Sequence, residues 1–202
     1  KDAYTSGHSI RVSQYAVATA ERMGFAGQSL EGIRLGGELH DIGKIGTSET
    51  VLHKPGTLTK EEFDQITKHP LLGEKMLSPL AHDSPDVLRI VRSHHERLDG
   101  RGYPDGLSGD QAPLPARIVS VVDVFDALTT NRPYRRAIPV EAAYGLLLQQ
   151  ARGGWCEPDL VHLFIDVHRA AHAPAGEDEC LSETHGGRGA PVEDGLNSPQ
   201  QP

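Results

Sequence analysis

The stretch HDIGKIG, residues 40–46, joins a histidine and an aspartate to two glycines at the end of a predicted helix. A neutral imidazole and a carboxylate together suit metal ions that take both nitrogen and oxygen ligands, such as iron, manganese or zinc. A lone His-Asp pair means little, because such dipeptides occur by chance and more often cap a helix or form an ion pair. Whether His40 and Asp41 bind metal therefore depends on the residues that the fold brings to them.

Helical signals dominate the chain, and no alternation of polar and apolar residues with period two extends beyond a few positions. Ser29 is a candidate N-cap, Thr59 and Glu62 have the spacing of a capping box, and Ser84 before Pro85 marks another helix start. The sequence predicts an all-α fold. Its helices are expected over about residues 8–23, 29–40, 59–69, 85–95, 139–151 and 158–171, with a further helix around Ile118, Val122 and Phe125. The segment Asp99–Pro115 is so rich in glycine and proline that it predicts a loop.

The formal net charge of −8 is unevenly distributed. Residues 173–202 lack apolar periodicity and are rich in Gly, Pro, Ser and acidic residues, which predicts a disordered acidic tail. This tail holds six acidic residues and one basic residue, so it carries −5 of the charge and leaves −3 for residues 1–172. A folded part this weakly acidic gives no support to binding of a nucleic-acid polymer, which requires a basic face.

The two cysteines, Cys156 and Cys180, suggest no disulfide framework and favour a reducing cytoplasm. The chain has no run of about eighteen apolar residues and no charged-then-apolar leader, so the sequence predicts neither a membrane span nor a signal peptide. It does not begin with Met, and a candidate ligand stands as early as His8. We therefore expect that an upstream portion is missing.

Seven histidines and aspartates lie within or at the ends of the predicted helices, which are rigid enough to hold a metal. These candidate ligands are His8, His40, Asp41, His69, His94, His95 and Asp123. Taken singly, each is more often an ordinary polar residue, and that interpretation is kept for His53, His82, His162, His168, His172 and His185. The set of seven is too large for one ion and sufficient for two if an aspartate bridges them.

Two adjacent metal ions acidify a shared water and hold both the attacking and the leaving oxygen of a displacement at phosphorus. Phosphoester hydrolysis is therefore the natural reaction class. Lys44 lies three residues after Asp41, and Arg132, Arg135 and Arg136 follow the helix of Asp123. These cations are candidates for phosphate contacts, although each arginine is as readily explained as a solvated surface residue.

Four motifs in a fixed order, HDIGKIG, KHP with Gly73 following, HHERLDGRGYPDGL and ARIVSVVDVFDALTTNRPYR, resemble the HD-GYP family of cyclic di-GMP phosphodiesterases. The resemblance covers roughly residues 2–165. It implies an HD-domain helical bundle over residues 1–172 with a glycine- and proline-rich GYP loop, and a centre of two or three metal ions, usually iron or manganese. It also implies hydrolysis of cyclic di-GMP to linear pGpG, in some members onward to GMP.

The same resemblance makes the seven candidates metal ligands and assigns catalytic roles to Asp41 and Lys44. It adds Lys44, Arg132 and Arg135 as phosphate contacts. The Gly102-Tyr103-Pro104 loop resembles the segment that the family uses beside its substrate and for docking diguanylate cyclase domains, and it would hold Tyr103 rigidly for stacking. A purely structural turn is the alternative for this loop. The family also implies an upstream regulatory domain.

Two departures from the family pattern affect the expectations. Members with a third metal carry a glutamate where this chain has Tyr4, so the sequence predicts two ions and a reaction that stops mainly at pGpG. Trp155-Cys156-Glu157-Pro158 replaces the usual Phe-Asp-Pro stretch, which we interpret as a packing variation. Two other functions stay open: a phosphohydrolase for another cyclic dinucleotide, and a non-catalytic interaction module that uses the GYP loop.

Overall fold

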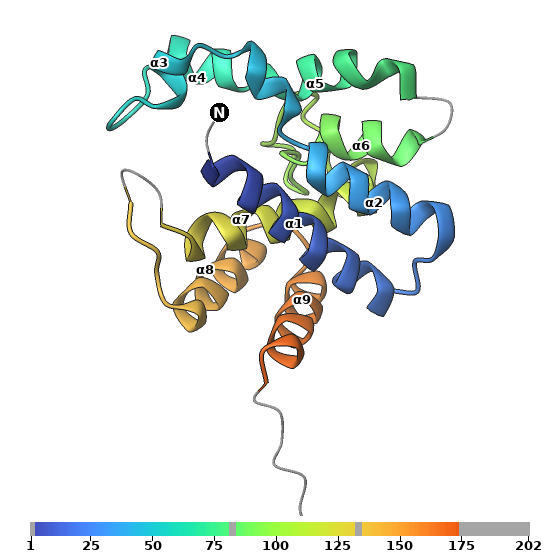
Figure 1. Cartoon of the computed structure of the whole chain (residues 1–202). Helices are drawn as coiled ribbons and strands as arrows, with labels where there is room; N and C mark the ends of the chain where they lie inside the picture. The colour runs from blue at the N-terminus through green and yellow to red at the C-terminus, as the bar shows by residue number, and fades with distance from the viewer. Residues whose placement is uncertain (1–2, 81–83, 132–134, 174–202) are drawn as a thin grey trace, which may run out of the picture. The chain divides into compact units, whose positions relative to one another are not determined.

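The structure is a computed structural model that describes residues 3–80, 84–131 and 135–173. Within these ranges the chain forms helices and no β-strand, and the only extended pairing is an isolated bridge between Asp99 and Ser108. The all-α prediction is therefore confirmed (Figure 1). The predicted tail lies outside the described residues except for Ala173. No described helix is both long enough and apolar enough to cross a membrane.

The helices follow the predicted order with two additions. They are α1 (Ala3–Arg22), α2 (Gly27–Leu39), α3 (Glu49–Leu52), α4 (Lys60–Ile66), α5 (His69–Leu77), α6 (Pro85–Ser93), α7 (Leu114–Thr129), α8 (Val140–Arg152) and α9 (Pro158–Ala171). Three short 3₁₀ segments accompany them, η1 (Ile42–Gly46), η2 (Ser78–Leu80) and η3 (Gly109–Gln111). The sequence did not predict α3 or a separate α5.

Helix α7 forms the centre of the fold, with α1, α6, α8 and α9 packed around it (Figure 1). Its residues from Ile118 to Val122 are all buried, and Phe125 is 2 % exposed. A helix that is apolar on every side must be enclosed by other elements, whereas a helix with one apolar stripe lies at the surface. Because α7 also carries Asp123, the core fixes one candidate ligand directly.

Two glycines let α2 approach its neighbours closely. A Cβ atom on Gly36 would lie 2.5 Å from Ile90 Cδ1 of α6, and one on Gly37 would lie 2.8 Å from the Cα atom of Ser13 in α1. Small residues at such crossings allow two backbones to touch without opening a cavity. The end of α2, which carries His40, is thereby held between α1 and α6.

Four of the predicted helix boundaries are wrong. Helix α1 begins at Ala3, five residues before the predicted start at His8. Ser29 does not cap α2, which begins two residues earlier at Gly27. The helix that begins with the Thr59-Glu62 capping box ends at Ile66, and the His69-Pro70 pair starts α5 instead of stopping α4. Proline tolerates the first turn of a helix because its missing N–H group needs no partner there. His69 is therefore the first residue of a helix.

The fourth wrong boundary concerns His94 and His95. Helix α6 starts at Pro85 as predicted, but it ends at Ser93, so His94 is the C-cap and His95 lies just beyond the helix. Residues at a helix end are freed from the fixed angle of about 100° between neighbours. Both imidazoles can therefore turn toward the same side.

Candidate metal centre

The structure brings the seven candidate ligands together from five helices and the turns that follow them. His8 comes from α1, His40 is the C-cap of α2, Asp41 is the N-cap of η1 and His69 starts α5. His94 and His95 follow α6, and Asp123 comes from α7. A Cβ atom on Gly43 would collide with the carbonyl oxygen of His69, so only glycine allows η1 to lie this close to α5.

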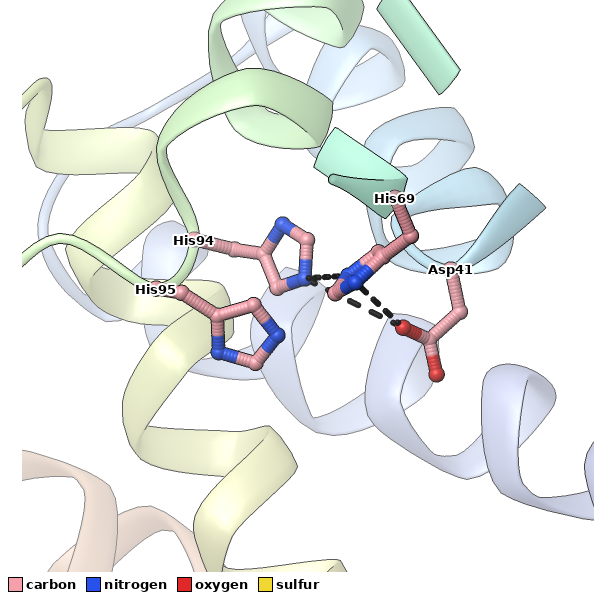
Figure 2. Close-up of side chains that lie close together, drawn as sticks. All are labelled: Asp41, His69, His94 and His95. Carbon is pink, nitrogen blue, oxygen red and sulfur yellow. Dashed lines mark hydrogen bonds and ion pairs between the residues drawn. The ribbon is translucent and has the colours of Figure 1, made fainter. Parts of the chain in front are cut away.

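One group of ligand atoms belongs to Asp41, His69, His94 and His95, and all of these atoms lie within 4.8 Å of one another (Figure 2). His69 Nε2 is 3.3 Å from His94 Nε2 and 3.3 Å from Asp41 Oδ1. His94 Nε2 is 3.9 Å from the same carboxylate oxygen. Three imidazoles and one carboxylate therefore point at a common centre.

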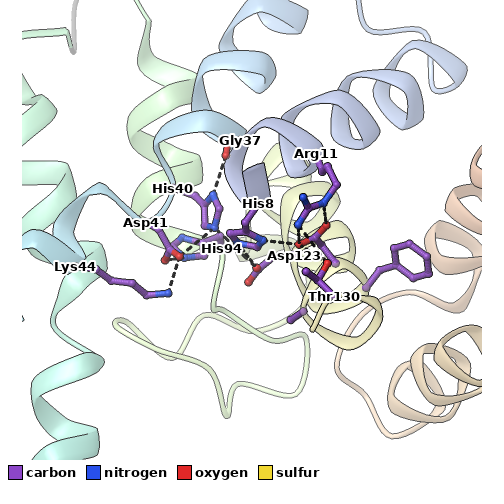
Figure 3. Close-up of polar contacts among 12 residues, drawn as sticks. His8, Arg11, Gly37, His40, Asp41, Lys44, His94, Asp123 and Thr130 are labelled. Atoms are coloured by element: carbon purple, nitrogen blue, oxygen red, sulfur yellow. Dashed lines mark hydrogen bonds and ion pairs between the residues drawn. The ribbon is translucent and has the colours of Figure 1, made fainter. Parts of the chain in front are cut away.

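A second group contains His8, His40 and Asp41, again within 4.8 Å (Figure 3). Asp123 adjoins it, with Oδ1 at 3.2 Å from His8 Nε2 and 3.9 Å from His40 Nε2. His40 Nε2 is 3.5 Å from Asp41 Oδ2. Asp41 therefore belongs to both groups, with Oδ1 facing the first and Oδ2 facing His40 of the second.

Backbone carbonyls orient three of these imidazoles. His40 Nδ1 donates to Gly37 O at 2.8 Å, His69 Nδ1 donates to Ile66 O at 2.8 Å, and His94 Nδ1 donates to Val91 O at 3.0 Å. When Nδ1 carries the proton of a neutral imidazole, Nε2 carries a lone pair. Each lone pair then points into the centre, which is the arrangement seen in metal-bound histidines.

Several acceptor atoms in the centre face one another with no hydrogen atom between them to form a hydrogen bond. His40 Nε2 and Asp41 Oδ1 are buried and have no hydrogen-bond partner within the described chain. The facing Nε2 atoms of His69 and His94 are both lone-pair atoms in the tautomers that their carbonyl partners select. Such a set repels itself unless a cation lies between its members, so these residues fit a metal centre.

Burial keeps three of the ligands neutral. It lowers the pKa of His69, lowers that of His94 well below its ordinary value, and lowers that of His95 to about 3. Neutral imidazole is the form that binds metal. Burial alone would raise the pKa of Asp41. The electrostatic effects of the neighbouring His40 and Lys44 outweigh burial and hold that pKa well below its ordinary value. A bridging carboxylate is thus ionised.

The second group is more basic. Burial alone would lower the pKa of His8, but hydrogen bonds to Asp123 and Asp126 outweigh it and raise that pKa to about 9. Burial alone would likewise raise the pKa of Asp123, yet its hydrogen bond to His8 and the charge of His40 hold it well below its ordinary value. Asp41 and Asp123 are therefore both ionised, and they offer negative charge to a cation in this half of the centre.

The predicted phosphate contacts are only partly described. Lys44 Nζ donates to Asp41 Oδ2 at 2.5 Å, so its charge lies at the edge of the ligand set. Arg135 is exposed and donates to the carbonyl oxygen of Ala127, which is not one of the seven ligands. Arg132 lies outside the described residues, as does the side chain of Tyr4. Tyr103 stacks on His95 with ring centroids 4.7 Å apart.

Sequence reasoning missed the role of Asp126, a buried carboxylate that supports His8. Asp126 Oδ2 accepts from His8 Nδ1 at 2.7 Å, and Arg11 Nε donates to the other oxygen at 2.5 Å. The signal was present, because residues three apart share one face of a helix and Asp126 stands three after Asp123.

Sequence reasoning also missed Glu96, which holds the GYP loop against the ligand histidines. Glu96 is 3 % exposed and accepts from the backbone N–H groups of Asp105 at 2.7 Å and Leu107 at 2.9 Å. Arg92 of α6 adds two bonds to the Asp105 carboxylate, at 2.7 and 2.8 Å. A Cβ atom on Gly102 would lie 2.5 Å from the Cα atom of Glu96, so the loop backbone packs directly on this segment.

Comparison with known proteins agrees with this geometry. Residues 1–160 match the family model described as the HD domain. The chain belongs to the HD domain family. Its motifs, its helical fold and its similarity to the proteins below also confirm the resemblance to HD-GYP proteins.

Two curated relatives in this family are named for cyclic dinucleotide hydrolysis. The cyclic di-GMP phosphodiesterase response regulator RpfG of Xanthomonas campestris is 42% identical over 166 residues, which is 82% of this chain and 44% of that protein. The 3'3'-cGAMP-specific phosphodiesterase 3 of Vibrio cholerae is 39% identical over 147 residues, 73% of this chain and 32% of that protein. The chain thus spans less than half the length of either relative.

A solved HDG"Y"P protein from Bdellovibrio bacteriovorus shares the fold of this family, with a TM-score of 0.67 and 23% identity. The alignment covers 82% of this chain and 52% of that structure. At this identity the likeness concerns the arrangement of helices, while the chemistry of the site depends on the residues described above.

Proposed function

We propose that this chain is a metal-dependent phosphodiesterase that hydrolyses cyclic di-GMP to linear pGpG. One observation carries the proposal: the carboxylate of Asp41 belongs to both ligand groups. A shared carboxylate is what a two-metal hydrolytic centre needs, because it fixes the separation of the two ions. The names of the two curated relatives support a cyclic dinucleotide as substrate.

Two divalent ions, iron or manganese, are the proposed cofactor. Five imidazoles and two carboxylates, of which Asp41 is shared by the two groups, form a mixed nitrogen and oxygen donor set that suits these metals. When bound, the ions would supply Lewis-acid activation of the phosphodiester and of water. The absence of cysteine from both ligand groups makes a purely structural zinc site a poorer fit.

The residues of the chain then have separate tasks. Asp41 bridges the two halves, and His8, His40, His69, His94, His95 and Asp123 complete them. Lys44 releases Asp41 Oδ2 and donates to a phosphate oxygen of the substrate, because its side chain is 36 % exposed and already reaches the edge of the ligand set. Arg132 and Arg135 are proposed as further phosphate contacts, and Tyr103 as a wall beside the substrate.

The product pGpG follows from the proposed number of ions. Tyr4 stands where family members with a third ion have a glutamate, and a phenol is a poor bridging ligand. Two ions suffice to open the cyclic substrate at one phosphodiester. We therefore expect release of GMP to be slow relative to the formation of pGpG.

A mixed cyclic dinucleotide is the second candidate substrate. The 39%-identical Vibrio cholerae relative is named as specific for 3'3'-cGAMP, which has the same phosphodiester ring as cyclic di-GMP and one adenine in place of guanine. Docking of diguanylate cyclase domains on the Gly102-Tyr103-Pro104 loop stays a prediction. The stacking of Tyr103 on His95 favours a role for this residue beside the metal centre.

The test is an anaerobic assay with protein loaded with iron or manganese. Cyclic di-GMP and 3'3'-cGAMP are incubated separately, and the products are resolved by ion-exchange chromatography, with Asp41→Ala as the inactive control. We expect pGpG to accumulate before any GMP in the cyclic di-GMP reaction. If neither the iron-loaded nor the manganese-loaded protein hydrolysed either substrate, the enzymatic function would be rejected. Early stoichiometric release of GMP would reject the proposed product.

A further inference from the structure

A cleft of about 510 Å³, lined in part by residues of α4, adjoins the candidate metal centre. His95 lines it, so one wall of the cleft is also a candidate metal ligand. Phe63, Tyr103 and Trp155 provide further aromatic walls. The volume lies within the range of roughly 300–1,000 Å³ that is usual for small-molecule sites.

The exposed ring of Phe63 can cover one face of a flat ligand. Phe63 is a 50 % exposed ring on α4, and it meets the Tyr103 ring edge-on with the centroids 6.3 Å apart. An apolar ring left this exposed at the mouth of a cleft gains from a partner that covers it. A purine base is such a partner, because it offers a π face and a polar edge at once.

The charges of the cleft do not favour a phosphate. Arg97 is already paired with the Asp99 carboxylate through two hydrogen bonds, at 2.9 and 2.7 Å. Asp64 adds a negative charge to the lining, opposite in sign to Arg101. An anion therefore gains little here, whereas the neutral base of a nucleotide avoids the repulsion from Asp64.

Arg101 can distinguish one base from another. Its guanidinium has no hydrogen bond or ion pair within the described ranges, and its backbone N–H donates to Asp99 Oδ1 at 3.0 Å, which fixes the position of its main chain. Guanidinium is a donor-only fork that matches the O6 and N7 acceptors of guanine, whereas adenine presents an N6 donor at the same edge. The cleft thus has a donor group that favours guanine, carried on an anchored stretch of main chain.

The wall that carries Arg101 is anchored by contacts within the chain. The backbone N–H groups of Asp105 and Leu107 donate to Glu96, and Gly102 packs on the same segment. A preformed wall lowers the ordering cost that a ligand must overcome.

We propose that this cleft binds a guanine base of the substrate, with the base against the Phe63 and Tyr103 rings and its O6/N7 edge on Arg101. This inference rests on the proposed function for the link to catalysis, since the adjoining His95 places the phosphodiester of the same nucleotide at the metal centre. It goes further by naming the residue that selects guanine over adenine.

The experiment compares the wild-type chain with Arg101→Gln, using Arg22→Gln, an exposed arginine at the end of α1, as the matched control. Binding of GMP and of AMP to the metal-loaded proteins is measured by calorimetry. Both nucleotides carry the same phosphate, so their affinity ratio reports the base alone. Turnover of cyclic di-GMP, 3'3'-cGAMP and the base-free bis(p-nitrophenyl) phosphate is measured on the same samples.

We expect Arg101→Gln to lower the affinity for GMP by about tenfold while changing that for AMP much less, because glutamine pairs with the adenine edge. The loss in kcat/KM should be larger for cyclic di-GMP than for bis(p-nitrophenyl) phosphate by a similar factor, and Arg22→Gln should behave as the wild type. An unchanged GMP to AMP ratio in Arg101→Gln overturns the inference. Wild-type protein that hydrolyses only bis(p-nitrophenyl) phosphate refutes the proposed function instead, and the GMP to AMP ratio still decides the guanine site.

Discussion

Asp126 Oδ2 accepts a hydrogen bond from His8 Nδ1 at 2.7 Å, and this bond turns His8 Nε2 toward Asp123. A carboxylate behind a metal-binding imidazole fixes the ring and raises its basicity. We expect Asp126→Asn to weaken metal binding by about tenfold, since an amide oxygen keeps the hydrogen bond but removes the charge. Titration of the metal-free protein with manganese against a chelator measures this change.

The control for this prediction is Asp166→Asn, which alters an exposed carboxylate on α9. It has the same change in charge and should bind metal as the wild type does. Equal affinities in Asp126→Asn and Asp166→Asn would show that Asp126 supports the packing of α1 and α7 without influencing the ligand.

Lys44 should affect turnover more than metal content. Its ammonium group contacts Asp41 Oδ2 but supplies no lone pair to a metal. Lys44→Met keeps the aliphatic stem, so we expect metal content to remain and kcat/KM for cyclic di-GMP to fall by about tenfold to a hundredfold, as for a lost bond to a charged group. Elemental analysis and steady-state kinetics are compared with Lys75→Met, an exposed site on α5. A Lys44→Met protein that purifies without metal would contradict the phosphate-binding role.

Glu96 should determine whether the GYP loop stays in place. Glu96→Ala leaves the backbone N–H groups of Asp105 and Leu107 without their partner, which we expect to lower the free energy of unfolding by about 2 kcal/mol. Urea denaturation measures the loss, and hydrogen exchange should show the amides of Asp105 and Leu107 losing protection first. Glu21→Ala, at an exposed position on α1, is the control. Unchanged exchange at both amides would show that other contacts hold the loop.

Much of the fold could be predicted because its signals are local. Thr59 and Glu62 form the predicted capping box, and Pro85 starts α6, because both depend only on residues within one turn. The starts of α8 and α9 agree with prediction to within one residue. His69-Pro70 was misjudged because a proline can end one helix or begin the next, and the choice depends on the packing of α5 against η1.

The sequence identified the candidate ligands that the structure brings together, but it did not identify the residues that position them. The ligand types and their motifs identify which residues meet, since imidazole and carboxylate are the usual ligands. The groups behind them depend on contacts across the sequence: His8 and Asp126 are 118 residues apart, and no periodicity links them. The same applies to Gly43, whose glycine is required by a carbonyl of α5 and not by the turn in which it stands.

His168 should make the stability of the fold sensitive to acid. It lies outside the ligand set, bonded to the Tyr144 hydroxyl at 2.7 Å, and burial together with the neighbouring His172 lowers its pKa from 6.5 to about 4. Between these two values the unfolded chain binds a proton that the folded chain does not. The contribution of His168 is therefore fully present above pH 6.5 and is lost as the pH falls toward 4.

Urea denaturation of the wild type and of His168→Gln between pH 7.5 and 4.5 isolates this contribution, because all other groups are common to both proteins. We expect the wild type to lose more free energy of unfolding across this range than the variant does. His162→Gln, at an exposed position on the same helix, should follow the wild-type curve. Parallel curves for wild type and His168→Gln would mean that the pKa of His168 is the same in the folded and unfolded chains.

Gly43 and Gly145 offer opposite outcomes for the same substitution. A Cβ atom at Gly43 collides with His69 O, so Gly43→Ala must push η1 away from α5 and separate Asp41 from His69. We expect a loss of about 2 kcal/mol in the free energy of unfolding together with weaker metal binding. At Gly145, within α8, the added Cβ meets no atom within 4 Å, so Gly145→Ala should instead gain about 0.5–1 kcal/mol from helix propensity. Urea denaturation and manganese titration of both variants test the pair. If Gly43→Ala instead kept the wild-type metal affinity, the ligand groups would not depend on the close approach of η1 to α5.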